Sequence, residues 1–179
     1  MNKKDTVVFD LDGTLLDTLE DLKNSVNYAM TQCGYPEHTL DEVRRYVGNG
    51  ILLLMQRAIP GGKDDPNFDK AFTLFKEHYG KHCNDTTKPY AGIMELLHTL
   101  KENNIKIAIV SNKADFAVKE LNAIYFKDLI PVAIGEKESE GIRKKPAPDT
   151  VIEALKQLGS TAENSVYIGD SDVDIETAR

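Results

Sequence analysis

Strand-type and helix-type segments alternate from Pro89 to the end of the chain, and this alternation restricts the fold more than any other feature of the sequence. Short apolar runs rich in β-branched residues are typical of buried parallel strands, and they occur at residues 105–110, 132–134 and 166–168. Apolar residues recur at helical spacing within residues 92–101, 114–124 and 149–158. The alternation predicts an α/β fold, with a Rossmann-like parallel sheet and helices on both of its faces.

A further strand is predicted near the N-terminus, and a long helical segment separates it from the others. Thr6–Phe9 is an apolar, β-branched run that stops at acidic residues and a glycine. From about Asp17 to Cys83 the pattern is helical, so we interpret this segment as a cap inserted after the first strand. We therefore predict a Rossmann-like core formed by residues 1–16 and 86–179, and a helical cap formed by residues 17–85.

Two local patterns support helices within the cap. Thr39 is followed three residues later by Glu42, which is the spacing of a capping box that opens a helix. An aromatic stripe at helical spacing follows at Phe68, Phe72, Phe75 and Tyr79. Such a stripe is typical of a packed core seam rather than of a cofactor site.

The sequence stops inside a predicted helix. The run 166–168 would normally be an interior strand, yet Arg179 comes partway through the helix that begins near Asp172. One further strand and its connections, roughly 30 residues by the usual size of such a unit, are expected beyond this point. The pattern therefore indicates a core whose C-terminal strand is missing.

Composition disfavours several classes of partner. The chain has 179 residues, of which 22 are basic and 29 acidic, and its net charge of −7 disfavours a nucleic-acid backbone as partner. No apolar run approaches the ~20 residues that cross a bilayer, and no apolar leader precedes the first strand. Cys33 and Cys83 form no CxxC pair, which suits a reducing compartment. We expect a soluble cytoplasmic protein with neither a nucleic-acid nor a membrane partner.

Four polar groups follow predicted strands or lie in a loop between them. They are Asp10–Thr14, Ser111–Lys113, Lys144–Pro146 and Gly169–Asp174. In an open parallel sheet, ligands bind at the carboxyl ends of the strands. We therefore expect these groups to meet at one edge of the sheet, although they lie far apart in the sequence.

The residue types in these groups point to phosphoryl chemistry. Three carboxylates at one place, Asp10, Asp12 and Asp170, repel one another unless a cation holds them, and oxygen ligands suit Mg²⁺. A carboxylate beside Mg²⁺ can attack phosphorus and form an aspartyl-phosphate. A second carboxyl two residues along can transfer protons to and from the reacting oxygens. A lysine and a serine would complete a cradle for the phosphate.

These motifs closely resemble those of the haloacid dehalogenase superfamily, over the whole chain and in the same order. Residues 9–18 resemble the first motif of the superfamily, and Ser111-Asn112 resembles the second. Lys145-Pro146 with Pro148-Asp149 resembles the third motif, and Gly169-Asp170-Ser171 with Asp174 resembles the fourth. The resemblance implies Asp10 as nucleophile and Asp12 as acid/base. It also implies that phosphate is bound by Ser111 and Lys145, beside which Thr14 and Asn112 are further candidate substrate-binding residues. Mg²⁺ would be held by Asp10, the backbone carbonyl of Asp12 and Asp170, with Gly169 and Asp174 in support.

Within this superfamily, the sequence resembles the bacterial phosphoglycolate phosphatase group. The segments Arg44–Gly50 and Ser111–Lys113 carry that resemblance, which implies a small phosphorylated metabolite, 2-phosphoglycolate, as substrate. Gly48 and Asn49 precede a predicted helix, where backbone N–H groups could bind a small carboxylate. The same loop could instead only pack two cap helices together, and the sequence leaves both readings open.

Other activities fit the sequence less well. A phosphosugar mutase resembling β-phosphoglucomutase would use the same two aspartates, and a non-catalytic receiver-like module would also combine Asp, Ser, Lys and Mg²⁺. A receiver needs neither a cap nor an acid at Asp12. A dehalogenase has no use for Asp12 as acid/base or for a metal-binding Asp170. A phosphonate hydrolase would require a cap lysine for a Schiff base, and the cap offers no clear candidate. His78, His82 and Cys83 lack a fourth zinc ligand, which favours a solvated helix face.

Overall fold

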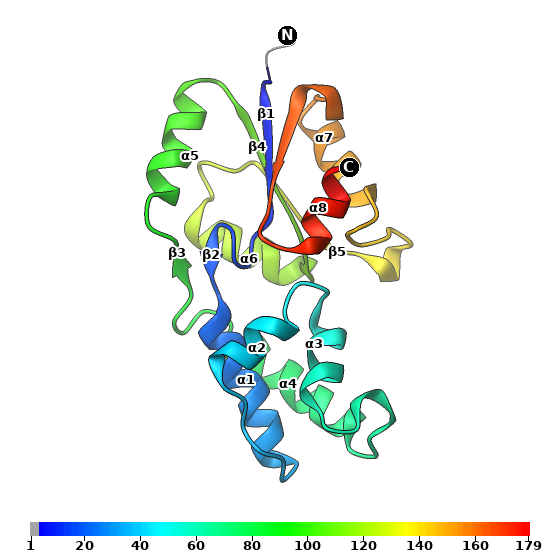
Figure 1. The fold of residues 1–179 in the computed structure, drawn as a ribbon. Coiled ribbons are helices and arrows are strands. Elements are labelled where there is room, and N and C mark those ends of the chain that lie inside the picture. Colours follow the sequence, from blue (N-terminus) through cyan, green and yellow to red (C-terminus); the bar gives the residue numbers. More distant parts are fainter. Residues whose placement is uncertain (1–3) are drawn as a thin grey trace. The chain divides into compact units, whose positions relative to one another are not determined.

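The computed structural model describes residues 4–179 and shows an α/β fold with two compact units (Figure 1). One unit consists of Met1–Leu16 and Pro89–Arg179, and the other is the continuous segment Asp17–Lys88. The chain crosses between the units at β2 (Leu16–Asp17) and β3 (Lys88–Pro89), which pair as a two-stranded sheet. The second crossing lies three residues beyond the boundary predicted between residues 85 and 86.

A parallel sheet forms the centre of the first unit, as the sequence predicts. Its strands are β1 (Thr6–Phe9), β4 (Lys106–Ala114), β5 (Val132–Glu136) and β6 (Ser165–Ile168), in the spatial order β5-β4-β1-β6. β1 pairs in parallel with β4 on one side and with β6 on the other. The carboxyl ends of β1, β4 and β6 therefore lie next to one another.

Helices cover both faces of this sheet because successive strand residues point to opposite sides. The helices are α5 (Ile93–Glu102), α6 (Asp115–Tyr125), α7 (Asp149–Gln157) and α8 (Asp172–Ala178), with short 3₁₀ helices η2 (Glu138–Glu140) and η3 (Ala162–Asn164). Phe9, Ile107 and Ile109 pack with buried residues of α5 and α6. Their neighbours Val8, Ala108 and Val110 pack with α7. Two hydrophobic layers therefore sandwich the sheet.

Strand β4 is longer than its apolar run indicates. The sequence predicts a strand over residues 105–110, whereas the structure continues it to Ala114. The pairing of β4 with β5 shifts register between Val110 and Ala114, as expected at a β-bulge. Ser111–Lys113 therefore belongs to the last, irregular part of the strand rather than to a loop after it.

Strand β6 lies at the edge of the sheet. Within residues 4–179 its strand neighbour is β1, and no strand pairs with its other side. Val166 and Ile168 are 40% and 39% exposed, which is high for apolar residues of a parallel sheet. The expected further strand beyond β6 stays a prediction.

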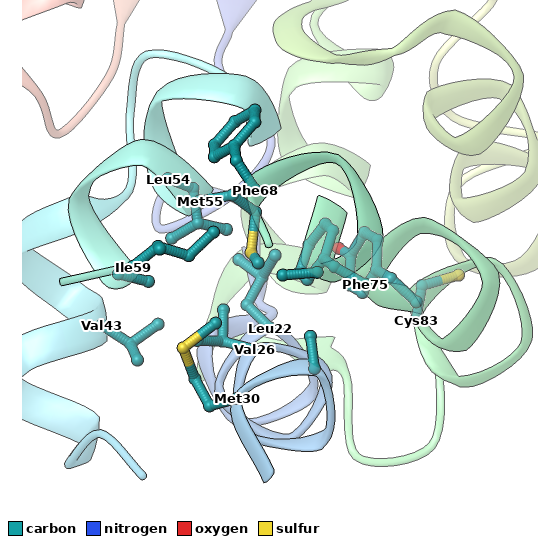
Figure 2. Packing of buried hydrophobic residues seen from close by; sticks show 14 residues of the cluster. Leu22, Val26, Met30, Val43, Leu54, Met55, Ile59, Phe68, Phe75 and Cys83 are labelled. Atoms are coloured by element: carbon teal, nitrogen blue, oxygen red, sulfur yellow. The ribbon is translucent and has the colours of Figure 1, made fainter. Parts of the chain in front are cut away.

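The second unit is entirely helical apart from its ends. It contains α1 (Leu19–Gln32), α2 (Leu40–Tyr46), α3 (Ile51–Ala58), the 3₁₀ helix η1 (Gly62–Asp64) and α4 (Phe68–His82). The helices share one hydrophobic core, in which side chains of α1 such as Val26 and Met30 face Met55 of α3 and Phe75 of α4 (Figure 2). Within residues 4–179, none of the helices has the length and apolar character needed to cross a membrane.

Both local predictions for the helical unit are confirmed. Thr39 Oγ1 accepts a hydrogen bond from Glu42 N, and the Glu42 carboxylate accepts one from Thr39 N, which is the capping box of α2. Phe68, Phe75 and Tyr79 of the aromatic stripe are buried, and Phe72 packs against the same cluster. The stripe is therefore part of the core.

Candidate active site

Asp10 and Asp12 follow β1 directly and occupy the centre of the sheet edge. The backbone N–H of Asp10 donates to Ile168 O of β6 at 2.9 Å, so the chain is still held to the sheet where the first carboxylate emerges. Leu11 is fully buried, and its carbonyl accepts hydrogen bonds from the N–H groups of Leu15 and Leu16. The turn that carries Asp12 is thus fixed by backbone hydrogen bonds on both sides.

Gly13 allows the two strand ends to approach each other. Its φ of +85° is in the left-handed region that glycine tolerates best. A Cβ at this position would collide with the carboxylate of Asp170. Thr14, the next residue, donates from Oγ1 to Asp170 Oδ1 at 3.2 Å. The first and fourth predicted motifs are therefore in direct contact.

Lys145 is the positive centre of this group. Its Nζ lies 2.9 Å from Asp10 Oδ1 and 2.7 Å from Asp174 Oδ1, and it donates to the Tyr167 hydroxyl at 3.0 Å. The residue is only 3% exposed. Asn112 Nδ2 donates to the backbone carbonyl of Lys145 at 3.0 Å and so ties the Lys145 loop to β4.

Asp174 is oriented by several donors at once. Its Oδ1 accepts from the Tyr167 hydroxyl at 2.9 Å as well as from Lys145, and its Oδ2 accepts from Ser171 N and Ser171 Oγ. The Ser171 contacts form the capping box that opens α8. Gly169 makes room for this arrangement, because a Cβ there would collide with the Asp174 side chain.

Three carboxylates come close enough to share a cation. Oxygen atoms of Asp10, Asp170 and Asp174 all lie within 4.8 Å of one another, and this is the one such group of metal-type ligands among the described residues. Carboxylate oxygens in this number, with one exposed member, suit a hard divalent cation such as Mg²⁺. The Asp12 side chain is outside the group, and the contribution of its backbone carbonyl stays a prediction.

The acidic residues around Lys145 have shifted pKa values, and burial is the first cause of the two upward shifts. Burial raises the pKa of Asp10 to about 7, against the opposing effect of Lys145 and with a further rise from Asp174. Burial also raises the pKa of Asp170. Burial alone would raise the pKa of Asp174 as well, but Lys145 and the hydrogen bonds it receives bring that pKa below its usual value. A cation beside Asp10 and Asp170 would stabilise their ionised forms, so the residues present fit a bound metal ion.

Asp12 is paired with a lysine that the sequence analysis did not single out for a role. Lys113 Nζ lies 2.9 Å from Asp12 Oδ1, and the lysine side chain is 3% exposed. The backbone N–H of Lys113 also donates to Ser111 Oγ at 3.2 Å. The sequence offered one signal for a role of Lys113, its position two residues after the candidate Ser111. Residues two apart in an extended strand point to the same side.

Gly48 and Asn49 belong to the helical unit, in the loop between α2 and α3. Gly48 has φ +115°, and α3 begins two residues after Asn49. Asn49 Oδ1 accepts from Arg57 Nη2 at 2.8 Å, and Arg57 Nη1 donates to Tyr46 O. These contacts hold the loop between α2 and α3, and a role of Gly48 and Asn49 in substrate binding stays a prediction.

The histidines of α4 have partners of other kinds. His78 Nδ1 is 3.0 Å from Ser25 Oγ, and His82 Nδ1 is 2.7 Å from Asp85 Oδ2. Cys83 is buried in the core of the helical unit. The sequence predicts a solvated helix face here; His78 and His82 are partly exposed, whereas Cys83 points into the core.

Comparison with known proteins identifies the family. The sequence model of the haloacid dehalogenase-like hydrolases matches residues 7–179. The phosphoglycolate phosphatase of Aquifex aeolicus is 33% identical over 177 residues, which cover 97% of this chain and 79% of that protein. The phosphoglycolate phosphatase of Pseudomonas putida is 31% identical over 179 residues, and here the match spans 97% of this chain but only 65% of the relative.

A solved structure supports the same assignment. The crystal structure of a predicted phosphoglycolate phosphatase from Haemophilus somnus has 27% sequence identity and a TM-score of 0.88, over 99% of this chain and 82% of that one. Its fold therefore agrees with the sheet and helices described above. By sequence and by fold, this chain belongs to the haloacid dehalogenase-like hydrolases.

Proposed function

We propose that this protein is a Mg²⁺-dependent phosphatase that hydrolyses a small phosphomonoester through an aspartyl-phosphate on Asp10. One observation carries the proposal: two carboxylates follow the central strand, and each is paired with its own buried lysine. The names of the relatives point to the same reaction class. The following steps assign a role to each group.

In the first step, a carboxylate oxygen of Asp10 attacks phosphorus while the bond from phosphorus to the ester oxygen breaks. The departing oxygen takes a proton from the Asp12 carboxyl and leaves as the free alcohol. Lys145 and Ser111 bind the phosphoryl oxygens and hold phosphorus in line with Asp10. Thr14 helps to position this site by donating a hydrogen bond to Asp170. Asn112 helps by donating one to the backbone carbonyl of Lys145.

In the second step, water hydrolyses the aspartyl-phosphate. The Asp12 carboxylate takes a proton from the water as its oxygen bonds to phosphorus, and the bond between phosphorus and Asp10 breaks. Inorganic phosphate leaves, and both aspartates return to their initial states. The net reaction converts one ester and one water into one alcohol and one phosphate.

The metal ion would be held by Asp10, Asp170 and the backbone carbonyl of Asp12, with Asp174 as a further ligand or support. When bound, Mg²⁺ supplies positive charge that offsets the negative charge of the nucleophile and of the phosphoryl group. The raised pKa of Asp10 supports this part of the proposal, since burial disfavours its ionised form even beside Lys145 and a bound cation would favour that form further.

We further propose 2-phosphoglycolate as the substrate and the cytoplasm as the location. The names of the relatives support this substrate, and Gly48 and Asn49 are the residues of the helical unit proposed to recognise its carboxylate. Neither Cys33 nor Cys83 forms a disulfide, which is consistent with a reducing compartment.

Release of inorganic phosphate tests the proposal. Purified protein is assayed with 2-phosphoglycolate, p-nitrophenyl phosphate and β-glucose 1-phosphate, each with Mg²⁺ and with a chelator. Mg²⁺-dependent release that favours 2-phosphoglycolate is the expected result. Release from the aryl ester alone would retain the phosphatase and reject the substrate. Conversion of β-glucose 1-phosphate that needs a bisphosphate primer and frees no phosphate would instead show a mutase.

A further inference from the structure

We propose that Lys113 is a positioning residue for Asp12, an inference that rests on the proposed phosphatase function. Lys113 comes from the bulged end of β4, and its Nζ lies 2.9 Å from Asp12 Oδ1 across 101 residues of sequence. By holding one oxygen of the carboxyl group, the ammonium group fixes the direction in which the other oxygen points. Asp12 can then meet the ester oxygen in the first step and the water in the second.

Stability alone is a poor explanation for this pair. Lys113 is 3% exposed and the Asp12 side chain 15%, so both charges have lost most of their water. A buried ion pair of this kind often adds no stability over an apolar pair of the same size, because desolvation offsets the attraction. Its position beside the proposed acid/base therefore indicates a catalytic use.

The two buried lysines of the site have different partners. Lys145 lies between Asp10 and Asp174 and so belongs to the nucleophile and the acidic cluster. Lys113 pairs with Asp12, and its backbone N–H also fixes Ser111 Oγ. The bulged end of β4 thus positions both the Ser111 hydroxyl, proposed to bind phosphate, and the Lys113 ammonium group, which contacts Asp12. Loss of the Lys113 charge should impair proton transfer more than phosphate binding.

Esters with different leaving groups separate these effects. p-Nitrophenolate leaves without help from an acid, whereas the alkoxide of an alkyl phosphate must be protonated. In Lys113→Met, kcat/KM for 2-phosphoglycolate, or for the best alkyl ester of the wild type, should fall about 100-fold, within the range of general acid catalysis. kcat/KM for p-nitrophenyl phosphate should stay within about threefold. Its release should show a burst, because hydrolysis of the aspartyl-phosphate still requires Asp12 as base.

Two further variants act as controls. Lys113→Arg keeps the charge and should restore most of the activity on the alkyl ester. Lys119→Met removes an exposed lysine that pairs with Asp115 at 2.6 Å, and should change neither substrate's kinetics. If Lys113→Met fails to fold, Asp12→Asn/Lys113→Met removes both charges together. Its residual activity on p-nitrophenyl phosphate should be within about twofold of Asp12→Asn alone, since Lys113 acts through Asp12.

The outcomes distinguish the inference from the function on which it rests. An equal loss on alkyl and aryl esters, or no loss on either, overturns the role of Lys113 while the phosphatase stands. A further tenfold loss in the double variant relative to Asp12→Asn also overturns it, because Lys113 would then act independently. A folded wild-type protein that hydrolyses none of the esters overturns the proposed function and this inference with it.

Discussion

Replacement of Asp21 by asparagine should destabilise the helical unit strongly. Asp21 is 1% exposed, and both of its carboxylate oxygens accept hydrogen bonds from the segment that follows α4. The donors are the N–H and hydroxyl groups of Thr86 and Thr87, at distances between 2.6 and 3.1 Å. The carboxylate therefore attaches the end of the unit to α1.

The magnitude follows from the number of donors. A hydrogen bond to a charged group contributes about 1.5–3 kcal/mol. Asparagine offers only one acceptor oxygen and turns an NH₂ group toward the remaining donors, so about two such bonds are lost. We expect the free energy of unfolding to fall by roughly 3–6 kcal/mol at pH 7. The control Glu77→Gln makes the same change from acid to amide at an exposed position on α4 and should shift it by less than about 0.5 kcal/mol.

The effect should depend on pH in a defined direction. Burial alone would raise the pKa of Asp21, but the hydrogen bonds from Thr86 and Thr87 bring it below its usual value. A carboxyl with a lowered pKa in the folded state stabilises the protein above the unfolded pKa of about 4. This contribution is lost as the pH falls through the folded pKa, so the wild type and Asp21→Asn should converge in acid. Urea unfolding of both proteins at several pH values measures this. A loss below about 1 kcal/mol at pH 7, or a difference that does not change in acid, would refute the reasoning.

Three other predictions concern the site. Asp10→Asn should lower phosphate release at least about 1000-fold in a protein that still folds, because it removes the nucleophile; activity near that of the wild type would exclude the mechanism. At limiting Mg²⁺, kcat/KM should fall below pH 7 as Asp10 is protonated, and the fall should move to lower pH as Mg²⁺ is raised; a profile insensitive to Mg²⁺ would contradict this. Gly13→Ala should raise the Mg²⁺ concentration needed for half-maximal activity at least about tenfold, because the Cβ of the alanine would displace the Asp170 carboxylate. Titration of activity with Mg²⁺ measures this concentration, and an unchanged midpoint would be inconsistent with the geometry.

Much of the fold follows from local sequence signals. The capping box at Thr39 and the strands and helices after Pro89 depend on neighbouring residues, and the structure contains them close to the predicted positions. The meeting of Asp10, Lys145 and Asp170 was also predictable, because parallel strands present their carboxyl ends at one edge of the sheet. Their catalytic roles stay predictions that the experiments above address.

Other features depend on contacts that local patterns do not encode. The polar residues Ser111–Lys113 resemble a loop, yet pairing with β5 across a bulge keeps them in the strand. Tyr167 resembles any half-buried strand residue, but its hydroxyl joins Lys145 to Asp174. The burial of Asp21 likewise requires the chain to return from the end of α4. Each of these three features depends on a partner that is distant in the sequence. Asp21 and Thr86, for example, are 65 residues apart.

The uneven charge of the site has a consequence for the order in which ligands bind. Four carboxylates, those of Asp10, Asp12, Asp170 and Asp174, share two lysine ammonium groups. A phosphate ester arriving as a dianion would meet net repulsion, whereas a divalent cation would be attracted. We therefore expect the cation to bind first and the ester second, so that metal concentration controls the apparent affinity for substrate and for the product phosphate.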